Sequence, residues 1–131
     1  SLYIQILEAA ITCEDLASFL PHNKDESICL TSIYIHNKMP IHPSDMLMEG
    51  IVTLRDEPWS AESLDHCAMG IGDFRISKQK AKLLLTTGTG KKLYFKLEKA
   101  ANTWYLKQLR VKQKHPSIPR KTKVDVIYYK L

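Results

Sequence analysis

Residues 80–112, KAKLLLTTGTGKKLYFKLEKAANTWYLKQLRVK, decide the fold of this 131-residue chain. Three runs rich in apolar residues, 81–86, 92–98 and 103–111, are separated by the short turn segments TGTG and AAN. Strands bounded by glycine and asparagine turns at this spacing predict an antiparallel β-meander. The stretch therefore indicates a sheet as the centre of the molecule.

The middle run alternates between apolar and polar residues. Side chains of a strand point alternately to its two faces, so apolar Leu93, Phe95 and Leu97 share one face. The opposite face carries Lys92, Tyr94 and Lys96. We therefore expect one apolar and one basic face.

Helical spacing of apolar residues predicts a helix over 2–10, and a second short helix is expected over 13–20. Thr12 and Asp15 resemble a capping box that begins the second helix, and Pro21 ends it. Two strands are predicted next, over 28–36 and 46–55. Gly50 within the second of these suggests a bulge.

A third helix is expected over 60–70, with Gly70 as its C-terminal cap, and a first strand of the sheet over 71–77. After the meander, two prolines and six cationic residues predict a solvated loop over 112–123. Residues 124–131, VDVIYYKL, alternate as a last strand.

Together these elements predict an α+β fold with N-terminal helices packed on one face of a mostly antiparallel sheet that ends in a β-meander. Composition is typical of a folded domain, with 44% apolar and 25% charged residues. We expect one domain over residues 1–131. The absence of an initial Met suggests a processed chain or a fragment of a longer one.

Charge is distributed unequally along the chain. Residues 1–74 contain three Lys or Arg and twelve Asp or Glu, a net charge of −9, whereas residues 75–131 contain sixteen and two, a net charge of +14. Such asymmetry points to an anionic partner for the basic half. Alternatively, the two halves neutralise each other by packing together.

Catalytic and metal motifs are weak. Residues 86–92, TTGTGKK, lack the first glycine and the Ser or Thr of a P-loop, so a hairpin turn is the better interpretation. Histidines and cysteines show no paired ligand spacing, so no metal site or cofactor is predicted. We predict no catalytic residue. Three widely spaced cysteines favour buried thiols in a reducing compartment, hence the cytoplasm or nucleus.

The basic face is the strongest functional signal. Lysines interleaved with tyrosines on an exposed sheet are typical of surfaces that bind RNA or single-stranded DNA, because cations neutralise phosphates and rings stack on bases. Lysine also simply keeps a sheet face hydrated. The predicted anion-binding residues of the sheet and the adjoining loop are Lys80, Lys82, Lys92, Tyr94, Lys96, Lys107, Lys112, Lys114, Arg120, Lys121 and Lys123.

The two tryptophans have different expected roles. Trp104 is expected to fill the core beneath the meander with its indole N–H bonded to a carbonyl. Trp59 lies between Pro58 and Ser60 in an acidic stretch and is the candidate contact residue for a partner.

The order of elements is similar to that of the NTF2-like cone folds, and residues 94–111, YFKLEKAANTWYLKQLRV, resemble the last hairpin of that group. The resemblance implies either a dimeric adaptor or a cone with a small-molecule pocket. It carries no family-specific motif, and no catalytic residue follows from it.

The sequence thus predicts a non-enzymatic interaction domain. Its basic C-terminal half is expected to bind nucleic acid first and an acidic protein surface second. The domain is also expected to self-associate through its acidic and basic halves, and no membrane-spanning run is found. The alternative is a small-molecule or catalytic pocket around Asp65, His66 and a tyrosine.

Overall fold

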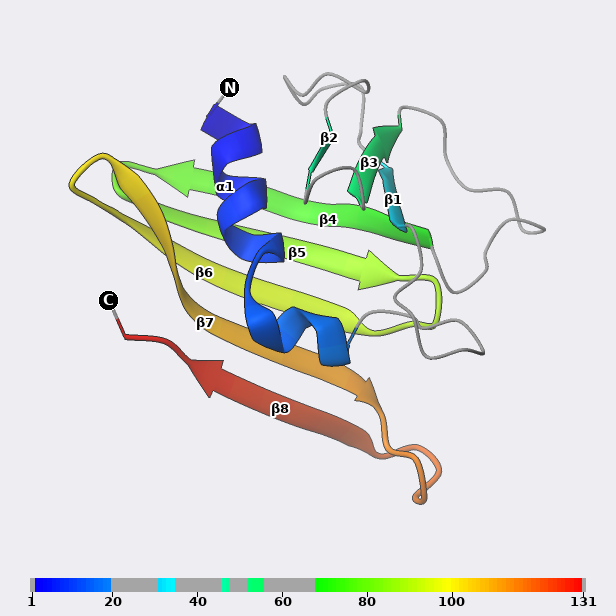
Figure 1. Ribbon diagram of the computed structural model, residues 1–131. Coiled ribbons are helices and arrows are strands. Elements are labelled where there is room, and N and C mark those ends of the chain that lie inside the picture. The colour runs from blue at the N-terminus through cyan, green and yellow to red at the C-terminus, as the bar shows by residue number, and fades with distance from the viewer. Residues whose placement is uncertain (1, 20–30, 35–45, 48–51, 56–67, 131) are drawn as a thin grey trace.

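A computed structural model describes residues 2–19, 31–34, 46–47, 52–55 and 68–130 of the chain (Figure 1). The described helices are α1 (Leu2–Ile11) and the 3-10 helix η1 (Glu14–Ser18). The described strands are β1 (Thr31–Tyr34), β2 (Met46–Leu47), β3 (Val52–Arg55), β4 (Ala68–Ser77), β5 (Lys80–Thr87), β6 (Lys92–Ala100), β7 (Thr103–Lys114) and β8 (Thr122–Tyr128).

The strands form one sheet in the order β2-β3-β1-β4-β5-β6-β7-β8. Strands β4 to β8 are antiparallel to their neighbours, and β1 is parallel to both β3 and β4. α1 crosses one face of the sheet, and η1 follows it over the same face (Figure 1). The predicted α+β fold, with a helix against an antiparallel meander, is confirmed.

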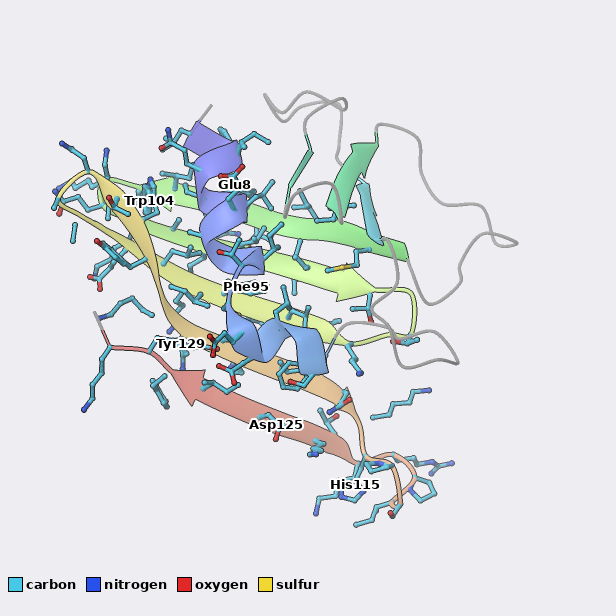
Figure 2. All side chains as sticks on the ribbon, in the orientation of Figure 1. Glu8, Phe95, Trp104, His115, Asp125 and Tyr129 are labelled. Atoms are coloured by element: carbon cyan, nitrogen blue, oxygen red, sulfur yellow. The ribbon has the colours of Figure 1, made fainter. Side chains whose placement is uncertain are left out.

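The core lies between the helices and the sheet face that they cover, which we call the inner face. Ile6, Leu7 and Ile11 of α1 pack against alternate residues of the meander, all of which are almost fully buried. Phe95 lies at the centre of these residues in Figure 2. The buried meander residues are Ala81, Leu83, Leu85, Leu93, Phe95, Leu97, Leu109 and Val111.

The β5–β6 connection is a hairpin turn, as expected. Gly90 adopts a φ of +88°, and its amide donates to the Thr87 carbonyl at 2.9 Å. The Lys91 amide donates to the Thr87 hydroxyl oxygen at 3.0 Å. Because both amides are occupied within the turn, they do not form a free cradle for a phosphate.

Two N-terminal details differ from the prediction. Thr12 does not cap the second helix, because its hydroxyl donates to the Glu8 carbonyl at 2.6 Å. Cys13 holds the N-cap position of η1 without a capping hydrogen bond from its side chain. The expected single strand over 46–55 is instead two, because β2 and β3 pair antiparallel with each other.

Two boundaries near the meander were also wrong. Gly70 does not end a helix, because residues 68–70 already belong to β4. β7 continues to Lys114 and β8 begins at Thr122, so the loop comprises only residues 115–121. Pairing with β8 keeps the end of β7 extended despite its charge. No helix among the described segments is long and apolar enough to cross a membrane.

Several sequence predictions fall outside the described residues. They include the contact residue Trp59, most of the third helix, and Asp65 and His66 of the alternative pocket. They stay predictions.

Candidate functional site

The sheet has a second face, opposite α1, which we call the outer face. Strand register and contacts place eight of the predicted anion-binding residues on it, six of them where the sequence put them, in the strands of the sheet. Residues opposite each other in a sheet point to the same side. Lys80 pairs with Glu98, Lys82 with Lys96, and Lys92 with Lys112. The six residues are Lys80, Lys82, Lys92, Tyr94, Lys96 and Lys107.

A β-bulge lies at Lys107. The β6–β7 register shifts between Lys96, which pairs with Gln108, and Leu97, which pairs with Leu106, leaving Lys107 as the extra residue. The Lys107 ammonium lies 3.7 Å from the Glu98 carboxylate, and Lys107 borders the same outer hollow as Lys80. Alternation from Tyr105 already assigns Lys107 to the outer face, and the bulge brings Gln108, Arg110 and Lys112 to the same face.

The remaining five predicted residues divide between three places. Lys112 and Lys114 belong to β7 and share the outer face, rather than lying in a loop. Arg120 and Lys121 are exposed in the 115–121 loop. Lys123 is the exception, because alternation along β8 puts it on the inner face, where its ammonium lies 3.8 Å from Asp125.

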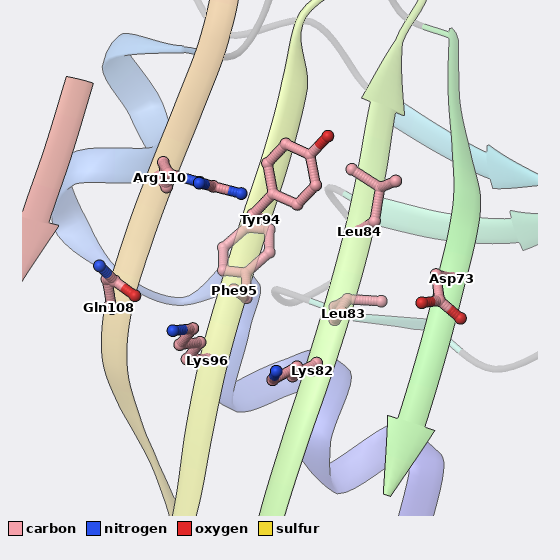
Figure 3. Close-up of a pocket in the computed structure, with 9 residues that line it drawn as sticks. All are labelled: Asp73, Lys82, Leu83, Leu84, Tyr94, Phe95, Lys96, Gln108 and Arg110. Carbon is pink, nitrogen blue, oxygen red and sulfur yellow. The ribbon is translucent and has the colours of Figure 1, made fainter. Parts of the chain in front are cut away.

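Tyr94 lies on the central strand of the outer face, close to two cations of the neighbouring strand β7. The guanidinium carbon of Arg110 lies 4.7 Å from the centroid of the Tyr94 ring, and the Lys112 ammonium lies 5.7 Å from it. Figure 3 shows Arg110 extending from β7 towards Tyr94. Cations over an aromatic face attract its π electrons and hold the ring in place.

Arg110 was not among the predicted site residues. Sequence reasoning left the register of the third meander strand open, and only the bulge at Lys107 brings Arg110 opposite Tyr94. A signal was present in the sequence. Leu109 and Val111 flank Arg110, so alternation alone assigns it to a polar face.

Two shallow hollows lie on the outer face. One of about 310 Å³ is bordered by Tyr94, Lys82, Lys96, Arg110 and Asp73 (Figure 3). The other, of about 390 Å³, shares Lys82 and Lys96 with the first and extends towards Lys80 and Lys107. The shared residues make the hollows neighbours. The outer face is therefore an uneven cationic surface with an aromatic ring at its centre.

Cations outnumber acids on the outer face within the described residues. Register and ion pairs assign nine cations to this face of β4–β8, and among the described residues Asp73 and Glu98 are its acids. Each acid already faces a cation, Arg75 at 3.1 Å and Lys107 at 3.7 Å. The nine cations are Arg75, Lys80, Lys82, Lys92, Lys96, Lys107, Arg110, Lys112 and Lys114.

The 115–121 loop has a defined internal structure. The Nδ1 atom of His115 accepts the backbone N–H groups of Ser117 and Ile118, both at 3.1 Å. The Lys121 amide donates to the Ile118 carbonyl at 3.3 Å, and Arg120 adopts a φ of +66°. These bonds hold two exposed cations, Arg120 and Lys121, at one end of the outer face.

A separate polar cluster joins the two ends of the chain. The Tyr129 hydroxyl donates to Asp15 Oδ2 at 2.8 Å and lies 3.8 Å from the Cys13 sulfur. Burial raises the pKa of the Cys13 thiol and also that of Tyr129, whose pKa the bond to Asp15 raises further. Both groups are therefore neutral at pH 7, which favours a structural role over a nucleophilic one. Figure 2 places Tyr129 beside η1.

Trp104 is buried as expected, with 6% of its surface exposed, but its N–H differs from the prediction. Nε1 is buried and has no hydrogen-bond partner in the described part of the chain. The described residues also contain no group of three or more metal-ligating side chains.

Comparisons with known proteins give no relative on which to base an assignment. No family model matches the chain, and searches of curated proteins and of solved structures found no match either.

Proposed function

We propose that this chain is a non-enzymatic interaction domain whose outer sheet face binds single-stranded nucleic acid. The observation that carries the proposal is the arrangement around Tyr94. One aromatic ring contacts the cations of Arg110 and Lys112, and further cations lie around it on the same face. Single-stranded nucleic acids are bound by this combination of stacking rings and backbone-neutralising cations.

The aromatic residues favour nucleic acid over an acidic protein surface as the partner. A carboxylate-rich surface needs only cations, whereas a base offers a π face to a ring or a guanidinium plane. Tyr105 and Tyr128 add exposed rings at two edges of the outer face. An acidic protein surface is the second partner in the proposal.

The half-buried free thiol of Cys13 supports a reducing compartment, the cytoplasm or the nucleus, as the place of action. The alternative of a small-molecule or catalytic pocket has no support from the described residues. Asp65 and His66, which were named for that pocket, lie outside the described residues, and neither borders the two hollows of the outer face.

The proposal is tested by titrating the protein against a fluorescent single-stranded oligonucleotide at two salt concentrations. For single strands, log K falls with log salt by about 0.7 for each phosphate that is neutralised. We expect the Lys92→Gln, Lys96→Gln, Lys107→Gln triple variant to reduce this slope by about 2. Charge reversal to Glu at the same positions is expected to abolish binding while the domain stays folded.

A matched control separates the face from net charge. The control replaces three lysines that lie away from the outer face. Lys78 is in the β4–β5 turn, Lys99 pairs with Trp104 on the inner face, and Lys130 follows β8. Their replacement by Gln changes the net charge by the same amount and is expected to leave the slope within about 0.5 of the wild type. Equal effects of the two triple variants would show non-specific attraction and refute the proposed face.

Tyr94→Leu distinguishes the two partner classes. Loss of one stacked base costs about 1–3 kcal/mol, so nucleic-acid affinity is expected to fall at least fivefold. Affinity for polyglutamate, which has no base to stack, is expected to stay unchanged. Binding of polyglutamate with no binding of the oligonucleotide at low salt would assign the face to an acidic protein instead.

A further inference from the structure

Strand β8 is at the end of the sheet. It pairs with β7 on one side, and no other described strand pairs with its far side (Figure 1). The strand is seven residues long, contains no proline, and pairs with β7 without a register shift. Natural edge strands are usually short, bulged, or interrupted by proline, because a regular free edge pairs with other strands.

Two hydrogen bonds show which backbone groups of β8 are free. The Tyr129 amide donates to the Lys107 carbonyl at 2.9 Å, and the His115 amide donates to the Lys121 carbonyl at 2.8 Å. The two pairs flank the β7–β8 ladder at its two ends and continue its register, in which bonded pairs alternate with non-bonded ones. Lys123, Asp125 and Ile127 therefore bond to β7.

The intervening residues point their backbone groups away from the sheet. They are Thr122, Val124, Val126 and Tyr128, each with an N–H and a C=O at the free edge. The apolar side chains of these positions are also exposed, with 47% of Val124, 40% of Val126 and 76% of Tyr128 accessible. The edge thus offers unpaired backbone groups and an apolar row together.

Charges along β8 are self-complementary in one antiparallel register. Lys123 and Asp125 point to the same side of the strand and are ion-paired at 3.8 Å, with both side chains partly exposed. If two copies pair with Val124 opposite Val124, each Lys123 faces Asp125 of the other copy. Centring on Asp125 would place two carboxylates opposite each other, which is destabilising.

We propose that β8 is a self-association edge that pairs antiparallel with β8 of a second copy, centred on Val124. The partner is another copy of this chain because the free backbone groups, Val124 and the Lys123–Asp125 pair all match themselves about that two-fold axis, while Val126 of each copy faces Thr122 of the other. The sheet then continues through both copies, with both outer faces on the same side. This inference does not depend on nucleic-acid binding.

Sedimentation equilibrium of the full chain, without nucleic acid and at about 0.15 M salt, measures the association. We expect a reversible dimer. Lys123→Asp makes positions 123 and 125 both acidic, and Asp125→Lys makes both basic. Each variant alone is expected to weaken dimerisation roughly tenfold, because two attractive cross-strand pairs become repulsive.

Mixing these two variants provides the decisive measurement. In a mixed pair each Asp of one copy faces a Lys of the other, so the heterodimer is expected to form with about the affinity of the wild type. The Lys123→Asp, Asp125→Lys double variant is likewise expected to dimerise. Failure of the mixture to associate, while the wild type does, would refute the register.

Val124→Pro tests the edge itself. Proline removes an N–H that faces away from β7, so β7 pairing is retained while two central bonds of the dimer are lost. A folded monomer is expected, with urea unfolding used to verify the fold. Unchanged dimerisation of this variant, or a wild type that is monomeric at about 100 μM, would overturn the proposal.

Discussion

The Tyr129–Asp15 hydrogen bond is predicted to stabilise the fold by connecting its two ends. The bond joins the residue after β8 to η1, across 114 positions of sequence. Hydrogen bonds to charged groups contribute about 1.5–3 kcal/mol, and the lower value applies because both side chains are half-buried. Tyr129→Phe is therefore expected to reduce the free energy of unfolding by about 1.5 kcal/mol at pH 7.

Urea unfolding followed by far-UV circular dichroism measures this loss. With a denaturant slope of about 1.5 kcal/mol per M, the midpoint is expected to fall by about 1 M. Tyr128→Phe is the matched control, because the Tyr128 side chain is 76% exposed and no hydrogen bond of its hydroxyl is described. That variant is expected to stay within about 0.5 kcal/mol of the wild type.

The pH dependence has a definite sign. The pKa of Tyr129 is raised in the folded state, so the folded protein holds the phenolic proton more tightly than the unfolded chain does. The contribution of Tyr129 is complete below about pH 10, the ordinary tyrosine pKa, and is lost as the pH rises above it. The difference between wild type and Tyr129→Phe is therefore expected to be constant from about pH 6 to 9 and to shrink above about 10.

A double-mutant cycle with Asp15→Ala isolates the bond from other effects of each change. The two losses are expected to be non-additive by about 1 kcal/mol, because either variant alone removes the same interaction. Additive losses would show that Tyr129 stabilises the protein through packing alone, and the reasoning from the hydrogen bond would be refuted.

Two further stability predictions concern Trp104 and Gly90. Trp104→Ala is expected to cost about 3–5 kcal/mol because it leaves a large cavity in the core. Trp104→Phe keeps an aromatic ring and removes a buried N–H that has no described partner, so it is expected to cost less than about 1 kcal/mol in urea unfolding, and a cost of about 2 kcal/mol or more would show that this N–H is bonded. Gly90→Ala is expected to cost about 1 kcal/mol because of its φ of +88°, although its Cβ would meet nothing within 4 Å. Gly70→Ala, with equal space and no positive φ, serves as the control and should cost about 0.5 kcal/mol or less.

Alternation and turn chemistry were sufficient to predict the meander. In β6 every second residue is apolar, and a single register satisfies the burial of Leu93, Phe95 and Leu97 together. The outer-face position of Lys92 and Lys96 follows directly from that choice. Prediction of the sheet therefore required only local information, because each strand is bounded by a recognisable turn.

The errors arose where long-range pairing outweighs local preference. The charges of Lys112 and Lys114 indicated a loop, but pairing with β8 keeps residues 112–114 extended in β7. Gly70 indicated a helix end, whereas β4 pairs with β1 and β5 at that position. The bulge at Lys107, which brings Arg110 to Tyr94, depends on how β6 and β7 align and has no clear signature in either strand alone.

The structure bears in part on whether the acidic residues of 1–74 neutralise the basic residues of 75–131. Twelve acidic residues precede position 75, and four of them, Glu8, Glu14, Asp15 and Asp73, are described. The first three belong to α1 and the η1 segment, which cover the inner face, so the sheet separates them from the outer cations. The ion pairs formed between described residues all join partners within 68–130. Of these four described acids, only Asp73 lies on the outer face, where it pairs with Arg75, so helices α1 and η1 contribute no counter-charge to that face.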